Sequence, residues 1–234
     1  MLIPNRPMRR SLKSFYRSAL SPVLGGSALF LAIFSILCGV GACRPKVADG
    51  VFVIGSEPRT VRVLHAPWDG LDDETVFSCW CEGGRLCFSY EVVDSTMTVF
   101  DEFPTERTVD DEDRVEIFFS CDSLMTSYWC AEIDPKGRPM DYAAHFGQPF
   151  DYEWNFRTLQ ADACLTARGY QVQGSVALSE LRELGIDTRN FYLGVFRADF
   201  HPDGSVNWYS LVSTDDKSAY FHKPNVLFPA TIRK

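Results

Sequence analysis

The chain has 234 residues, of which 46% are hydrophobic and 23% are charged, and this composition indicates a globular protein and excludes a disordered one. The formal net charge is −8, but residues 1–42 contain five basic residues and no acid, so the remainder carries −8 − 5 = −13. A body with this excess of carboxylates repels phosphate backbones, which predicts that nucleic acid is not a partner.

The N-terminal 42 residues predict an export signal. A basic stretch is followed by an uncharged run over residues 18–42, whose most apolar part is residues 28–37. Small residues then precede Cys43, as in a secretory signal with its cleavage site. The Gly41-Ala42-Cys43 sequence resembles the lipobox of bacterial lipoproteins, which implies cleavage before Cys43 and attachment of lipid to its thiol. An uncleaved membrane anchor is the alternative, because about 20 apolar residues span a bilayer.

Both alternatives place residues 44–234 outside the cytoplasm, held at the membrane of the cell envelope. Residues 43–60 are rich in turn formers and are expected to form a tether that leads into a first strand near residues 51–54. The lipoprotein signal peptide is therefore assigned to residues 1–42, the lipidated tether to residues 43–60 and the folded domain to residues 61–234.

Alternating apolar and polar residues recur along the domain, with turn-forming residues between the runs. The clearest run covers residues 85–94, where Leu86, Phe88, Tyr90 and Val92 share one face. Further strands are predicted over residues 114–120, 128–133, 163–167, 170–176, 191–200 and 208–212. Many short strands with turns between them predict an all-β fold, an antiparallel β-sandwich of the immunoglobulin-like or jelly-roll-like kind.

One short helix is predicted over residues 179–184, with Ser179 as its N-cap and Gly185 ending it. Six cysteines remain after Cys38 and Cys43 are set aside, and six cysteines allow 15 disulfide connectivities. A zinc site would require Cys-x2-Cys pairs, and Cys79 and Cys81 are separated by one residue, so inert or disulfide-bonded cysteines are expected.

The order of several short motifs resembles that of family 9 carbohydrate-binding modules, in particular the stand-alone family 9-like proteins of bacterial envelopes. The resemblance covers about residues 60–234 and rests on the segments 91–94, 113–119, 128–132, 169–173, 178–181, 197–200 and 221–224, together with Trp154 and Trp208. It implies an antiparallel β-sandwich that holds sugar in a surface slot between aromatic rings and polar side chains. Sugar rings pack their C–H faces on aromatic planes, and their hydroxyls require paired donors and acceptors.

The resemblance also implies roles for individual residues. Glu116 matches a sugar-binding carboxylate, Glu132 lies near a polar ligand-binding position, and Phe221 matches one of two tryptophans that sandwich the sugar. The position of the second tryptophan aligns near Asp110, and the family arginine beside Glu132 aligns with Cys130.

From these matches and their neighbours we expect two groups of ligand-binding side chains. One group forms hydrogen bonds with sugar hydroxyls, and its members are Glu116, Glu132, Arg197 and His201. The other group stacks on the sugar ring and consists of Phe221 with Trp129 or Trp208. Arg197 has an equally acceptable structural role as the partner of one of the many acids.

Calcium is the expected cofactor, because the family often carries calcium beside its loops and hard cations bind several oxygen ligands from a loop. Asp94 and Asp113 are the candidate ligands, although the acidic run at residues 110–113 is also explained as a solvated turn.

The expected function is non-catalytic binding of oligo- or polysaccharide at the cell envelope, in support of polysaccharide capture or breakdown. A structural or assembly lipoprotein with a degenerate sugar slot is the alternative, favoured by the missing tryptophan and arginine. A glycoside hydrolase is the third possibility, because Glu116 and Glu132 on adjacent strands could form a catalytic carboxylate pair. The sugar and the oligomeric state are left open.

Overall fold

The computed structural model describes residues 50–62, 64–66, 71–212 and 219–233. The predicted signal peptide and Cys43 lie outside these residues. None of the helices in these ranges has both the length and the apolar character needed to cross a bilayer.

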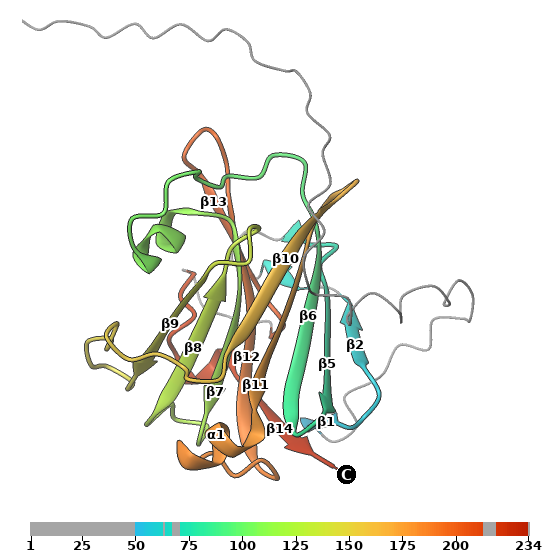
Figure 1. Cartoon of the computed structure of the whole chain (residues 1–234), viewed down its shortest axis with the longest axis vertical. Coiled ribbons are helices and arrows are strands. Elements are labelled where there is room, and N and C mark those ends of the chain that lie inside the picture. The colour runs from blue at the N-terminus through green and yellow to red at the C-terminus, as the bar shows by residue number, and fades with distance from the viewer. Residues whose placement is uncertain (1–49, 63, 67–70, 213–218, 234) are drawn as a thin grey trace, which may run out of the picture. The chain divides into compact units, whose positions relative to one another are not determined.

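The described residues form two β-sheets, as the alternation predicted (Figure 1). The larger sheet has nine strands, and seven of them follow the order β4-β3-β13-β12-β7-β8-β9. Their bounds, with those of β1 and β14, are β1 (Phe52–Ile54), β3 (His65–Ala66), β4 (Leu71–Asp72), β7 (Arg114–Ser120), β8 (Tyr128–Ile133), β9 (Pro139–Ala144), β12 (Phe191–Phe200), β13 (Val206–Ser210) and β14 (Phe228–Ile232). β14 pairs with β12 on one side and, in parallel, with β1 on the other.

The smaller sheet is antiparallel and has five strands in the order β10-β11-β6-β5-β2. Their bounds are β2 (Arg59–Arg62), β5 (Val76–Glu82), β6 (Arg85–Val93), β10 (Gln160–Thr166) and β11 (Gly169–Ala177). The hairpin of β10 and β11 was predicted with shorter strands, and β13 begins and ends two residues before its predicted bounds.

The short helix α1 (Leu178–Glu183) lies at the end of the molecule opposite the β12–β13 turn (Figure 1). The predicted cap is wrong, because the helix begins one residue earlier and Ala177 is its N-cap, without a side-chain hydrogen bond. Gly185 ends the helix as predicted, with a left-handed φ of 87° that favours glycine. Two 3-10 helices, η2 (Glu106–Asp111) and η3 (Pro224–Val226), lie in loops.

The main core fills the space between the two sheets. The predicted face of β6 lies in it, with Leu86, Phe88, Tyr90 and Val92 all buried. β1 also contributes, because Phe52 and Ile54 are buried in the same core. The folded unit therefore includes residues that the sequence assigned to the tether.

The second face of the larger sheet is covered as well. All seven residues of β7 are buried, where the alternation predicted one buried face. A second apolar cluster, here called the outer cluster, lies on this face and contains Val109, Phe118, Met125, Tyr128, Cys130, Met140, Tyr142, Ala144, Phe196, Phe221, Val226 and Leu227. The strands at the middle of the larger sheet are thus packed between two apolar layers.

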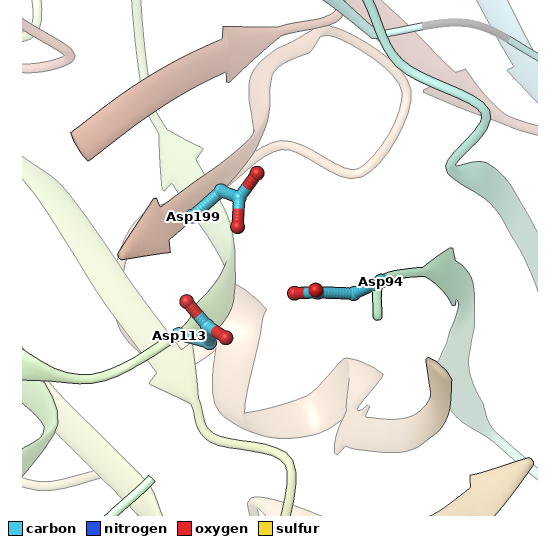
Figure 2. Close-up of side chains that lie close together, drawn as sticks. All are labelled: Asp94, Asp113 and Asp199. Atoms are coloured by element: carbon cyan, nitrogen blue, oxygen red, sulfur yellow. The ribbon is translucent and has the colours of Figure 1, made fainter. Parts of the chain in front are cut away.

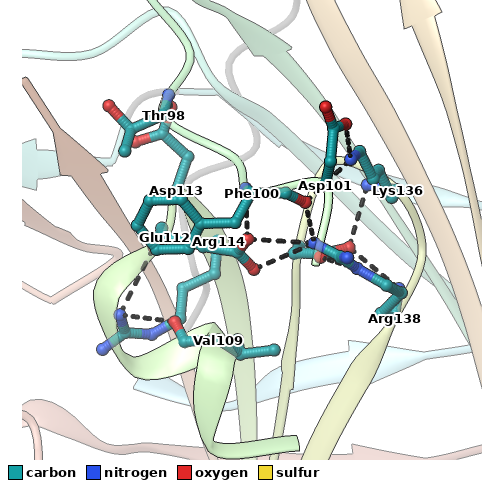
Figure 3. A network of polar contacts seen from close by, with 10 residues as sticks. Thr98, Phe100, Asp101, Val109, Glu112, Asp113, Arg114, Lys136 and Arg138 are labelled. Atoms are coloured by element: carbon teal, nitrogen blue, oxygen red, sulfur yellow. Dashed lines mark hydrogen bonds and ion pairs between the residues drawn. The ribbon is translucent and has the colours of Figure 1, made fainter. Parts of the chain in front are cut away.

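Polar contacts hold the loop between β6 and β7 against the sheet (Figure 3). Arg138 forms an ion pair of 2.9 Å with Glu112, which is buried, and Lys136 Nζ donates a hydrogen bond of 2.7 Å to the main-chain oxygen of Phe100. Arg114 Nη1 donates to two main-chain carbonyls of η2 at 3.0 and 3.2 Å. These contacts fix the loop that carries the acids at the beginning of β7.

The six cysteines of the domain are free thiols. Cys79 lies in the core between the sheets and Cys130 in the outer cluster, whereas Cys164 is exposed. Burial raises the pKa of the Cys79 and Cys130 thiols, which keeps both protonated at neutral pH. Of the two expected states, inert or disulfide-bonded, the free thiols correspond to the inert one.

Candidate functional site

Glu116 and Glu132 lie side by side on the outer face of the larger sheet. Glu116 is on β7 and Glu132 directly opposite on β8, so the two side chains leave the sheet on the same side. Arg114, two residues before Glu116, shares that face and contacts both acids. Its Nε lies 2.9 Å from Glu116 Oε1 and 2.6 Å from Glu132 Oε2, so one guanidinium joins the two carboxylates.

The two acids are almost entirely removed from solvent. Glu116 is 1% exposed and Glu132 is 3% exposed. Burial and the repulsion between them raise the pKa of Glu116 to about 8, and burial raises the pKa of Glu132 as well, against the opposing effect of Arg114. At neutral pH Glu116 therefore holds a proton more often than a free carboxyl group does, which reduces the repulsion between the two acids.

Aromatic side chains surround this ionic group. Tyr142, on β9, donates a hydrogen bond of 2.6 Å to Glu132 Oε1. The Trp208 ring, on β13, is 5.5 Å from the Arg114 guanidinium and 5.4 Å from the Phe221 ring. The predicted residues Glu116, Glu132, Trp208 and Phe221 are therefore brought together on one face.

Phe221 and His222 belong to a segment that passes over the outer face. We call residues 219–223 the strap. The Phe221 ring is stacked on Phe196 of β12, and the His222 ring is stacked on Phe118 of β7. Burial and the positive charge of Arg114 lower the pKa of His222 to about 4, so this ring is neutral at physiological pH.

Two predicted residues lie on the other face of the same sheet. Trp129 is opposite Phe119, faces the core between the sheets and packs near Trp154, with ring centroids 6.4 Å apart. Arg197 is 2% exposed and points to the same inner side, at the end of the sandwich. Arg197 follows Phe196, which is paired with Glu116, and Trp129 lies three residues before Glu132. An odd spacing along a strand places a side chain on the opposite face, so neither side chain joins Glu116.

Arg197 is instead held by acids. Its guanidinium forms ion pairs with Asp73 at 3.1 Å, with Asp94 at 2.9 Å and with Asp199 at 3.3 Å. Of the two roles that the sequence allowed for Arg197, the structure therefore contains the pairing with acids. His201 is close by, half-buried, and its Nε2 contacts Asn207 Nδ2 at 2.8 Å.

Asp94 and Asp113 meet at this end of the sandwich, where Asp199 joins them (Figure 2). One carboxylate oxygen from each of the three lies within 4.8 Å of the others. Asp113 accepts hydrogen bonds from the main-chain amides of Thr98 and Phe200. Burial, together with the charges of Asp94 and Asp199, raises the pKa of Asp113 to about 7.

Several residues of the outer face were absent from the sequence prediction. Arg114 was within reach, because residues two apart on a strand share a face and Glu116 had already been selected. Tyr142 lies on a strand that begins at Pro139 and was not predicted. His222 is in a loop, where no periodicity indicates which side chains point inward.

Comparisons with known proteins match the fold. No protein-family model matches the chain, and no curated protein sequence does. A solved structure from Bacteroides uniformis, of a protein for which a carbohydrate-binding role has been suggested, aligns with 75% of this chain and 87% of its own at 12% identity and a TM-score of 0.56. This likeness shows a shared sandwich fold.

Two solved structures of a family 9 carbohydrate-binding module from Caldicellulosiruptor kristjanssonii also align with 78% of this chain. The complex with cellotriose has 12% identity, covers 93% of the module and gives a TM-score of 0.48. The complex with glucose has 13% identity, covers 95% of the module and gives a TM-score of 0.44.

Proposed function

We propose that this protein binds neutral carbohydrate without catalysis, at the outer face of its larger sheet. The observation that carries the proposal is the pair of acids, Glu116 and Glu132, held by Arg114 and surrounded by aromatic rings. Carboxylates and a guanidinium supply acceptors and donors for hydroxyl groups, and aromatic planes receive the C–H face of a sugar ring. The sandwich shared with the suggested carbohydrate-binding protein of Bacteroides uniformis adds support.

The position of Arg114 between the two acids argues for binding rather than hydrolysis. A glycosidase separates its two carboxyl groups across the scissile bond, and a water or the sugar carbon lies between them. Here both acids contact the same nitrogen of Arg114, so the guanidinium takes the position that a substrate would require. We infer that the acids act as hydrogen-bonding groups.

The cell envelope is the proposed location. The support comes from the sequence, in which a basic stretch, an apolar run and Gly41-Ala42-Cys43 resemble a lipoprotein signal. In this proposal Cys43 carries lipid, and the domain holds oligo- or polysaccharide near the membrane for capture or breakdown by other proteins.

The proposal includes a structural calcium ion held by Asp94, Asp113 and Asp199. The donor set fits, because three carboxylate oxygens from separate segments converge and hard cations bind oxygen. Asp199 Oδ1 is buried and has no hydrogen-bond partner among the described residues, although Arg197 lies 3.3 Å away. The oxygens of Asp113 each accept one hydrogen bond, which leaves further lone pairs for an ion. When bound, calcium would fix the loop that precedes β7.

A structural or assembly lipoprotein is the second candidate, and one observation favours it. Glu116 and Glu132 are covered, and a side chain without access to solvent does not reach a ligand in this arrangement. A sugar-binding protein must uncover the two acids, whereas an assembly protein has no need to do so.

A glycan array, followed by calorimetry of each hit, tests the proposal. The variants Trp208→Ala and Glu132→Gln are expected to weaken binding by about tenfold or more, which corresponds to about 1.4 kcal/mol. Trp80→Ala is the matched control, because this half-buried tryptophan lies on β5 of the smaller sheet. A protein that binds no glycan, or that loses binding equally in the control variant, would refute the assignment.

A further inference from the structure

The strap packs against the outer face of the larger sheet through the ring of Phe221. The Phe221 ring is 4.3 Å from the Phe196 ring at an interplanar angle of 15°, which is a parallel stack on β12. The edge of Trp208 closes against the same ring at 5.4 Å. Phe221 is 4% exposed as a result, so its flat surface is occupied by the protein itself and is not presented to solvent.

His222 fills the neighbouring position with a ring that also forms polar contacts. It is stacked on Phe118 with ring centroids 5.1 Å apart, and Phe150 lies on it at 4.4 Å. The Tyr128 hydroxyl lies 3.1 Å from His222 Nδ1, and the Tyr142 hydroxyl lies 3.4 Å from Nε2. A ring between aromatic planes, with polar groups at its edge, is an arrangement that a bound sugar could also form.

The contacts of His222 lead directly to the proposed sugar-binding acids. Tyr142, which touches His222, also donates to Glu132, and the charge of Arg114 acts on the His222 ring. The strap therefore sits above the same floor of Arg114, Glu116 and Glu132 on which the proposed function depends.

We propose that the strap is an internal ligand, which occupies the carbohydrate site and must be displaced before a sugar ring reaches Glu116 and Glu132. The inference rests on the proposed function and adds its regulation. Apparent affinity falls by the fraction of molecules with the site open, so an open population of about 10% weakens binding about tenfold. The ligand that replaces Phe221 and His222 is an uncharged ring with hydroxyl groups at its edge.

The sign of one mutational effect separates this proposal from a fixed site. If Phe221 and His222 were walls of the slot, their removal would weaken sugar binding. If they are an internal ligand, His222→Ala is expected to bind the glycan about tenfold more tightly than the wild type does. Leu165→Ala is the control, because Leu165 is 69% exposed on β10 of the smaller sheet, and it is expected to leave the affinity unchanged. Weaker binding by His222→Ala would overturn the proposal.

A second measurement reports how often the strap is displaced, and it requires no sugar. Cys130 is fully buried in the outer cluster, and its thiol is near Tyr142. Labelling with a thiol reagent, read by mass spectrometry of the Cys130 peptide, is expected to be about tenfold faster in His222→Ala than in the wild type, following the open population. Cys79 is the internal control, because it is equally buried between the sheets, and its labelling should not change.

The two measurements distinguish a failure of the proposed function from a failure of the proposal about the strap. If neither the wild type nor His222→Ala binds any glycan, while Cys130 labelling is faster in the variant, the proposed function is refuted and the strap is a cover over something else. If the wild type binds glycan and Cys130 labelling is unchanged in the variant, carbohydrate binding stands and the internal ligand is refuted.

Discussion

The buried His222 predicts a measurable dependence of stability on pH. Its ring lies among Phe118, Phe150 and the hydroxyls of Tyr128 and Tyr142, and the charge of Arg114 acts on it. Among the residues that the structure describes, no carboxylate forms an ion pair with this ring, and the Tyr142 hydroxyl that contacts it donates to Glu132. The perturbation is His222→Phe, which keeps a flat ring and removes the titrating group.

The size of the stability change follows from the pKa shift of His222. Burial and Arg114 lower the pKa of His222 from 6.5 to about 4. Between these values the unfolded chain binds a proton that the folded chain does not bind, so stability falls as the pH drops from 6.5 to 4. The full shift is worth about 3 kcal/mol, of which about 2 kcal/mol has been lost at pH 5.

Urea unfolding at pH 7.5 and pH 5.0 measures this loss. Other groups also titrate in this range. The raised pKa values of Glu116 and Asp113 act with the opposite sign, because ionisation of a buried acid destabilises the folded state as the pH rises. These groups are common to both proteins, so the comparison removes them. The wild type is expected to lose about 2 kcal/mol more than His222→Phe between the two pH values.

His145→Phe is the control, because His145 is exposed and the structure buries no charge there. The reasoning is refuted if wild type and His222→Phe lose stability in parallel. That outcome would mean that the ring is hydrated in the folded protein and that the strap does not cover the outer face.

Other substitutions test the remaining parts of the structure. Arg114→Met, read by urea unfolding, should cost about 3–5 kcal/mol, because it removes the positive charge that pairs with two buried acids, and Glu116→Gln should cost less. Calcium should raise the melting temperature of the wild type and leave that of Asp113→Asn unchanged, and equal shifts would argue against the ion. Gly174→Ala places a Cβ 2.3 Å from the Phe88 ring and should cost about 1–3 kcal/mol in the same urea assay, whereas no loss would show that this packing relaxes.

The fold was largely predictable because its strands alternate. Residues 114–120, 128–133 and 191–200 form strands with the predicted bounds. β9 begins at a proline, a residue that argues against a strand when only the sequence pattern is considered. β14 has five residues and no turn signal of the kind that marks a hairpin.

The candidate site was predictable only in part, because alternation assigns a face and does not say what lies over it. Glu116 and Glu132 were correctly expected on adjacent strands. Trp129 is three residues from Glu132 on the same strand, and an odd spacing places it on the opposite face, so the alternation already contained this result. The partners of Arg197 depend on the register of β12 against β7, and the position of His222 depends on the path of a loop. No local sequence pattern encodes either the register or the loop path.

The parallel pairing of β1 with β14 has a mechanical consequence. Phe52 pairs with Ala230 and Ile54 with Ile232, so the first and the last of the described strands lie side by side and run in the same direction. A pulling force applied at the two ends draws these strands past each other, and their hydrogen bonds share the load instead of opening one after another. A domain held at its amino end and strained at its carboxyl end would therefore resist extension first at this seam of the larger sheet, before the other strands of that sheet separate.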